Sequence, residues 1–166
     1  MQIVTLDRLQ RGYTYECTKK PGIFDDPTFK PDLTPQQMLE LGVFGGNYFE
    51  GEHREFPKSW FKNAKLSEDG EYDVQCNLFR IRASQSREVW IQKGWIHKDD
   101  PRGWFQWYCR YYLGRRHGDD ARQISRWSKM TRHIRWLQNA CPVGELSCRP
   151  RQRQALLHWA YDGRRL

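Results

Sequence analysis

Two carboxylate pairs and a nearby histidine stand close together in the middle of the chain, where they could form an acid–base site. One pair, Asp99-Asp100, follows a histidine and precedes Arg102, and the second pair follows the short turn 114–118. A carboxylate, an imidazole and a guanidinium around one point can move a proton and hold an anion. The candidate catalytic residues are therefore Asp99, Asp100, Asp119, Asp120 and His97.

Both carboxylate pairs also have a structural interpretation. Asp is a preferred N-cap, and each pair stands where a helix is expected to begin. A network of ion pairs that closes the fold would use the same residues. If the two pairs came together they could bind Mg²⁺, which needs only one or two protein carboxylates when substrate phosphates supply further ligands. The cofactor stays undecided, with Mg²⁺ as a candidate.

The basic residues are concentrated in the second half of the chain. Residues 1–80 contain 10 Lys and Arg against 13 Asp and Glu, whereas residues 81–166 contain 18 against 7, mostly arginine. The planar guanidinium fork suits phosphate, so this asymmetry favours an anionic partner, and nucleic acid above all. The candidate phosphate ligands are Arg102, Arg110, Arg115, Arg116, Arg122, Arg126, Arg149, Arg151 and Arg153.

Two groups of cations carry this interpretation. Arg149, Arg151 and Arg153 crowd the expected first turn of a helix, where the helix dipole disfavours cations unless an anion is bound there. The alternative is pairing with the acidic half, for instance with Glu50, Glu52 or Glu55. The second group lies along residues 120–139 at a spacing of three to four, and its alternative is a solvated helix face. Its members are Arg122, Arg126, Lys129, Arg132 and Arg135.

The tryptophans offer surfaces on which bases could stack. Trp90, Trp95, Trp104 and Trp107 are the candidates, although rings at helical spacing are more often core, where we expect most of them. The chain shows neither the H-E-x-x-H nor the C-x-x-C pattern of common metal sites, and it has no P-loop and no G-x-S-x-G elbow. We therefore expect no dedicated metal site.

Hydrophobic periodicity and capping signals predict a mainly α protein, a compact helical domain with an irregular or two-stranded N-terminal part. Thr34-Pro35, Asp100-Pro101 and either Ser84 or Ser86 are typical of helix starts, and Gly42, Gly94 and Gly114 of helix ends. We expect residues 1–33 to form an irregular arm and residues 34–166 a single helical domain. The expected strands span 2–6 and 13–15, and the expected helices span 34–41, 84–93, 100–113, 119–140 and 150–161.

Cysteine use and hydropathy suggest the setting. The five cysteines are odd in number, so we expect free thiols and an intracellular protein, cytoplasmic or nuclear; a disulfide between Cys141 and Cys148 is allowed but not implied. No apolar run approaches the roughly 20 residues of a membrane span, and the first residues are too short for a signal peptide. No membrane partner is expected.

Three segments resemble a family of small uncharacterised proteins of bacteria, fungi and plants. These are the segment 33–49, the run GWIHKDDPRGWFQWYCRYYLGRR at 94–116 and the run CRPRQRQALLHWAYD at 148–162. The resemblance covers the chain from about residue 33 onward, and it implies a standalone unit without implying an activity, a cofactor or a catalytic residue.

Three functions fit the sequence. The first is a nucleic-acid-binding protein, which could also be an enzyme acting on a base or on the backbone through the arginines and the aspartates. The second is a small-molecule enzyme in which Arg110, Arg115 and Arg149 clamp a phosphate or carboxylate in one deep pocket. The third is an interaction module whose basic half pairs with its own acidic half or with an acidic partner. Whether the protein is an enzyme, whether it binds DNA or RNA, and its oligomeric state are left open.

Overall fold

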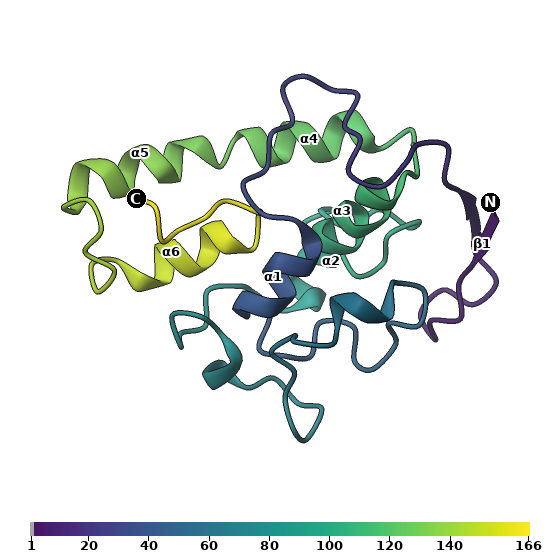
Figure 1. The fold of residues 1–166 in the computed structure, drawn as a ribbon, viewed down its shortest axis with the longest axis horizontal. Coiled ribbons are helices and arrows are strands. Elements are labelled where there is room, and N and C mark those ends of the chain that lie inside the picture. The colour runs from purple at the N-terminus through teal and green to yellow at the C-terminus, as the bar shows by residue number, and fades with distance from the viewer. Residues whose placement is uncertain (1) are drawn as a thin grey trace.

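The computed structural model describes residues 2–166, in which helices surround an aromatic core and a short hairpin closes one end (Figure 1). Helical residues make up 34% of the chain, and irregular segments join them. Strands β1 (Gln2–Val4) and β2 (Thr14–Glu16) pair antiparallel, with Ile3 opposite Tyr15. The α-helices are α1 (Pro35–Leu41), α2 (Arg87–Gln92), α3 (Trp104–Leu113), α4 (Asp120–Ser128), α5 (Thr131–Ala140) and α6 (Pro150–Leu157).

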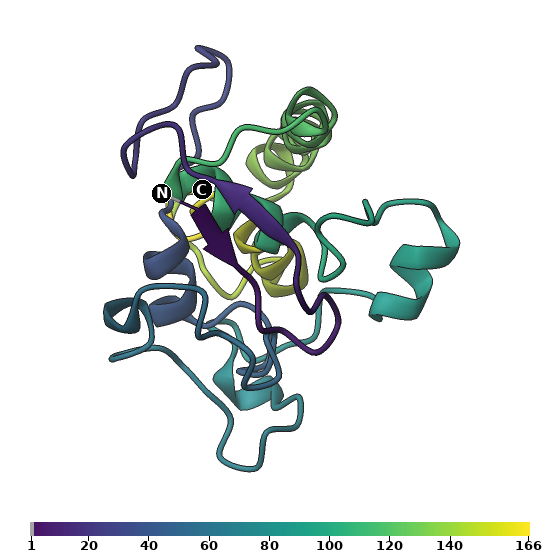
Figure 2. The same cartoon turned by 90° about the vertical axis from the view of Figure 1, so that its right-hand side faces the viewer.

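The consecutive helices α4 and α5 form the upper edge of the molecule in Figure 1. In Figure 1, α4 and α5 follow one another as an almost continuous rod, and α6 runs back beside α5. Two 3₁₀ turns, Lys58–Trp60 and Val74–Cys76, interrupt the irregular segment between α1 and α2. Figure 2 shows α2 standing out from the body on its two flanking loops, and this helix buries none of its residues. None of the helices within residues 2–166 is both long enough and apolar enough to cross a membrane.

Local capping chemistry predicts two helix starts correctly. Thr34 and Gln37 form a reciprocal capping box at the start of α1, and the side chain of Ser86 caps α2. Gly114 ends α3 with a left-handed φ of 115°, and a Cβ at this position would lie 1.9 Å from the carbonyl oxygen of Lys19. Only glycine fits there.

Three expected helices have different bounds. The helix predicted from Asp100 begins only at Trp104, because the Asp100 carboxylate turns inward instead of capping. The helix predicted over 119–140 is divided into α4 and α5 near residue 129. Ser128 and Thr131 each donate a hydroxyl hydrogen bond to the carbonyl three residues earlier, a contact that bends helices. The final helix ends at Leu157 rather than at Tyr161, and Ala160 is left-handed.

The core is aromatic, and the N-terminal segment completes it. The aromatic side chains that recur at helical spacing along α3 are mostly buried, and Trp107 and Tyr108 are the centre of this group. Phe29 packs against rings from α3 and α4 at centroid distances of 5.0 to 6.4 Å. Because Phe29 and Leu33 are both buried in this core, the described part of the segment expected as an arm, residues 2–33, packs as part of the body.

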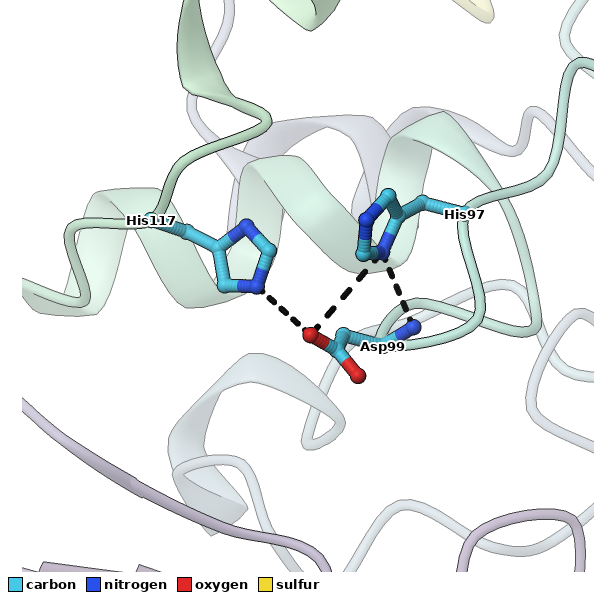
Figure 3. A group of neighbouring side chains, drawn as sticks. All are labelled: His97, Asp99 and His117. Carbon is cyan, nitrogen blue, oxygen red and sulfur yellow. Dashed lines mark hydrogen bonds and ion pairs between the residues drawn. The ribbon is translucent and has the colours of Figure 1, made fainter.

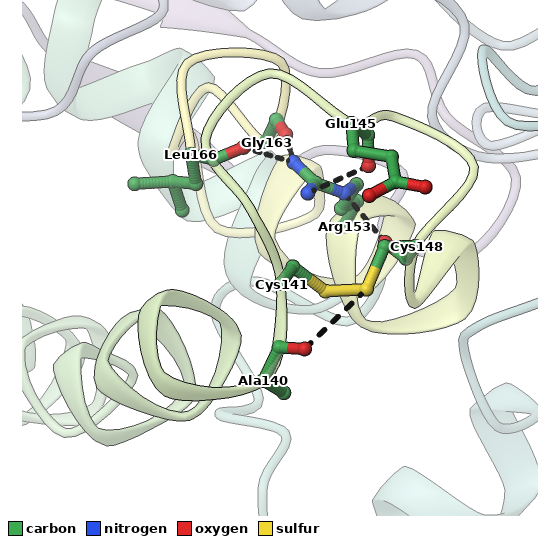
Figure 4. The surroundings of a disulfide bond; sticks show 7 residues. All are labelled: Ala140, Cys141, Glu145, Cys148, Arg153, Gly163 and Leu166. Atoms are coloured by element: carbon green, nitrogen blue, oxygen red, sulfur yellow. Dashed lines mark hydrogen bonds between the residues drawn. A yellow bond between two sulfur atoms is a disulfide. The ribbon is translucent and has the colours of Figure 1, made fainter.

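A disulfide joins Cys141 and Cys148 in the turn between α5 and α6 (Figure 4). The prediction of free thiols is therefore wrong for these two residues, whereas Cys17, Cys76 and Cys109 are free. The same turn wraps around the buried Arg153, whose guanidinium donates to the carbonyl oxygens of Cys148, Gly163, Leu166 and Glu145. The disulfide and Arg153 together fix the C-terminal segment against α6.

We expect replacement of both Cys141 and Cys148 by serine to lower the free energy of unfolding by about 2 kcal/mol, because a bridge between residues seven positions apart restricts the unfolded chain. Urea denaturation followed by circular dichroism measures this effect, with Cys76→Ser as the control for loss of a free thiol. Equal midpoints for the wild type and the double variant would show that the bridge does not stabilise the fold.

Candidate functional site

Asp100 lies at the centre of a buried ion network. Its carboxylate is fully enclosed and accepts hydrogen bonds from Arg110 Nη1 at 3.0 Å and from Arg115 Nη2 at 2.7 Å. Arg110 also donates to both carboxylate oxygens of Glu55, at 2.8 and 2.9 Å. Burial alone would lower the pKa of Arg110, but the hydrogen bonds and charges of Glu55 and Asp100 raise it. Arg110 therefore stays ionised and paired in the interior.

Arg102 forms a second buried pair beside the first. Its Nε and Nη2 donate to the two oxygens of Asp7 at 2.6 and 2.9 Å, and Nη1 donates to Glu50 at 3.0 Å. Burial opposes ionisation of Asp7, yet the hydrogen bonds from Arg102 hold the pKa of this carboxyl below its usual value. The bidentate geometry is the strong form of an Arg–carboxylate contact.

Four of the nine candidate phosphate ligands thus have side chains that are hydrogen-bonded to groups inside the protein. Arg102, Arg110 and Arg115 bind carboxylates, and Arg153 binds carbonyl oxygens. Their side chains are buried, so a phosphate outside the molecule could not reach them in this conformation. We therefore no longer assign these four to a phosphate. The physical reason is that the fold supplies internal partners, which are carboxylates for three of these arginines and carbonyl oxygens for Arg153, and composition alone could not position them.

We expect Asp100→Asn to lower the free energy of unfolding by about 3 to 5 kcal/mol, because it leaves two buried guanidinium groups without their shared counter-charge. Thermal and urea denaturation measure this loss. The matched control is Glu52→Gln, which removes one half of a surface pair with Arg8 and should change stability by less than about 1 kcal/mol. Equal effects of the two variants would contradict the structural role of Asp100.

Two of the remaining acid–base candidates, His97 and Asp99, meet beside His117, as Figure 3 shows. His117 Nε2 lies 2.7 Å from Asp99 Oδ2, and His97 Nδ1 lies 3.9 Å from the same oxygen. The Nδ1 of each ring accepts a backbone N–H from two residues ahead, at 3.0 Å: His97 from Asp99, and His117 from Asp119. The sequence singled out His97 and Asp99 but missed His117, because only the fold brings the turn after α3 against residues 97–99.

His97, Asp99 and His117 are the described residues that could hold a metal ion, since one donor atom from each lies within 4.8 Å of the others. Two imidazoles and one carboxylate suit a transition metal better than Mg²⁺, which prefers oxygen ligands. Each Nδ1 already accepts a backbone N–H, so the remaining nitrogen of a neutral ring carries its proton. A metal would have to displace these hydrogen bonds, and the residues as arranged do not fit one.

The other two catalytic candidates serve structure in different ways. Asp119 lies at the start of α4 and binds Arg122 through two hydrogen bonds, at 2.6 and 3.0 Å. Asp120 accepts from the indole N–H of Trp107 at 2.8 Å and from the backbone N–H of His117 at 2.8 Å. The two Asp-Asp pairs therefore do not combine into one carboxylate site.

A groove of about 640 Å³ opens beside this cluster, between the segment leading through α2 and the faces of α3, α4 and α6. Its lining includes Trp90, Trp95 and Trp104, three of the four tryptophans expected as stacking surfaces. Arg122 lies at one side of it, so the ion pair with Asp119 connects the groove to the histidine cluster. The groove is lined by aromatic residues Phe44, Tyr48, Trp90, Trp95, Trp104, Phe105 and Trp159, and by Arg122, Arg126, Lys129 and Arg132.

Arg126 is the most unusual cation in the groove. Its guanidinium lies 5.2 Å from the ring centre of Trp159 and 6.0 Å from that of Trp95, and it donates to the carbonyl of Trp95 and the amide oxygen of Gln123. No carboxylate among residues 2–166 pairs with it. Burial, together with the charge of Arg122, lowers the pKa of Arg126 to about 10, so it is still cationic at neutral pH.

Three further candidates lie away from the groove. Arg116 stacks on Tyr111 and pairs with Asp25 at 2.6 Å. Arg149 borders a separate hollow of about 130 Å³ beside Trp136, and Arg151 is exposed on α6. The deep pocket that would join Arg110, Arg115 and Arg149 is not formed by the described residues, because Arg110 and Arg115 face the internal network.

His158 is a buried histidine in the wall of the groove, next to Phe44. Its ring stacks on Phe44 at 4.8 Å, and Nε2 bonds to the carbonyl of Val43. Burial lowers the pKa of His158 from 6.5 to about 4. In the unfolded chain the ring binds a proton below pH 6.5, whereas in the folded protein it does so only below about pH 4.

Stability should therefore fall as the pH drops from about 6.5 to about 4, by up to about 1.4 kcal/mol per pH unit from this group. We expect His158→Gln to show a shallower loss of unfolding free energy over the same interval, since glutamine does not titrate. Urea denaturation at several pH values gives the slope of unfolding free energy against pH for the wild type and for the variant. Carboxylates contribute equally to the two slopes, so their difference reports on His158. Identical slopes would contradict the neutral, buried state of His158.

Comparison with models of protein families, with curated proteins and with solved structures finds no match to this chain. The resemblance of segments 33–49, 94–116 and 148–162 to a family of small proteins therefore stays a prediction. Any function must be argued from the groove and the residues around it.

Proposed function

We propose that this protein binds nucleic acid in the groove between α2, α4 and α6. The observation that carries the proposal is the combination of aromatic rings and cations on one concave surface, with Arg126 held there without a carboxylate. Nucleic acid offers both complements, because its phosphates neutralise guanidinium groups and its bases stack on rings.

The distribution of paired and unpaired cations supports this choice over a general electrostatic surface. In the network around Asp100 the arginines have carboxylate partners, whereas Lys129 and Arg132 at the groove have no ion pair among residues 2–166. Arg122 is paired with Asp119 but lies 40% exposed along its side chain, so it can also contact a ligand. The cations on α4 and directly after it are therefore available to bind an anionic ligand.

The start of α3 adds to the positive potential of the groove. Gly103 precedes the helix and has no side chain to cap it, and Gly103, Trp104 and Phe105 all line the groove. The N-terminal end of a helix carries partial positive charge that favours anions. This contribution acts together with the arginine side chains and would be weak without them.

We expect the double variant Arg126→Gln and Arg132→Gln to weaken binding of a short labelled oligonucleotide about tenfold at low salt. It should also reduce the slope of log affinity against log salt by about one to two, because fewer counterions are released. Fluorescence anisotropy across a salt series, with and without Mg²⁺, measures both quantities.

The matched control is the double variant Arg149→Gln and Arg151→Gln, which removes two cations from the start of α6, outside the groove. It should leave affinity nearly unchanged. If this pair weakens binding and the groove pair does not, the interface lies on α6. If no oligonucleotide binds at low salt, the proposal fails and a small aromatic anion becomes the ligand to test in the groove. The bound strands run on a denaturing gel would show whether any is cleaved.

A further inference from the structure

We propose that the groove selects unpaired nucleotides, with one base stacked on Trp90 and its phosphate against Arg126. This inference rests on the proposed nucleic-acid binding and specifies the form of nucleic acid that is bound. It depends on three features of the groove: a free aromatic ring, a cation without a counter-charge, and a limited volume.

Trp90 is the free ring. Of the eight tryptophans, it alone makes neither an aromatic pair nor a cation–π contact among residues 2–166. It is half-buried and lines both the main groove and an adjoining hollow of about 220 Å³. A Cβ on Gly103 would lie 3.4 Å from its ring, so the backbone at Gly103 supports the indole closely. The ring is thus held in place yet has no partner.

Arg126 is the cation. Its position between Trp95 and Trp159 fixes the guanidinium at the groove, and its protein acceptors are a carbonyl and an amide oxygen, which leave its charge uncompensated. A phosphate in the groove would supply the missing negative charge. Trp90 and Arg126 line the same groove, so one nucleotide could contact both.

The groove volume selects against a duplex. About 640 Å³ lies within the range of pockets that enclose a small ligand, which suits a nucleotide rather than a double helix. In a duplex each base is stacked on both faces and cannot present a face to Trp90, whereas an unpaired base can. A surface that recognised phosphates alone would not make this distinction.

The test compares three labelled ligands with equal numbers of phosphates: a short single strand, the same strand with abasic sites in place of its bases, and a duplex. We expect the natural single strand to bind the wild type about tenfold more tightly than either of the others. Trp90→Ala should weaken binding of the natural strand about tenfold and leave the abasic strand unaffected, while Trp90→Phe should restore most of the loss. Trp136→Ala, which removes an exposed tryptophan outside the groove, is the control.

Equal affinity of the wild type for all three ligands would overturn the inference while leaving nucleic-acid binding intact. A similar loss for natural and abasic strands in Trp90→Ala would overturn it as well, because the ring would then act through structure alone. Binding of none of the three ligands at low salt would defeat the proposed function itself. The comparison on the wild type does not depend on whether any variant folds.

Discussion

A single buried carboxylate, shared between two arginines, determines how the chain is organised. Asp100 is enclosed between Arg110 and Arg115, and Arg110 continues the network to Glu55 and to Gln10. Three segments distant in sequence, around residues 10, 55 and 100–115, therefore meet around one charge centre. Charges in the interior are stable only when they are paired and hydrogen-bonded, so each of these segments must be in place for the others to remain buried.

This arrangement explains why the charge asymmetry of the sequence does not translate into a uniformly basic surface. Acids from residues 1–80, such as Asp7 and Glu55, enter the interior and neutralise arginines of the second half. Among the cations without a carboxylate partner in the described residues, Arg126, Lys129 and Arg132 lie on or directly after α4 and border the aromatic groove. The same chemistry thus stabilises the fold in one place and creates a binding surface in another.

Local features were predictable from the sequence, while long-range pairing was not. The capping box of Thr34, the helix end at Gly114 and the buried stripe of α3 follow from nearest-neighbour chemistry and periodicity. For Asp100 the sequence allows an N-cap, a catalytic acid or a member of an ion-pair network, and local chemistry favours the cap, whereas the structure places Asp100 in the network. Arg102 and Asp7 are 95 residues apart, and nothing local indicates that they meet. Trp90, Trp95 and Trp104 could be named as stacking candidates, but the groove itself could not be predicted, because its other rings, such as Phe44 and Trp159, come from distant parts of the chain.

The aromatic core has a consequence for how the protein acquires its structure during synthesis. Phe29 and Leu33 cannot be buried until Trp107, Tyr108 and Trp127 have been synthesised. Asp7 likewise pairs with Arg102, which follows it by 95 residues. The first part of the chain therefore leaves the ribosome without a surface to fold against. Contacts between residues so far apart in sequence make folding slow and leave apolar groups exposed in the interval. The segment that contains Phe29 and Leu33 therefore cannot be buried until α3 and α4 have been synthesised.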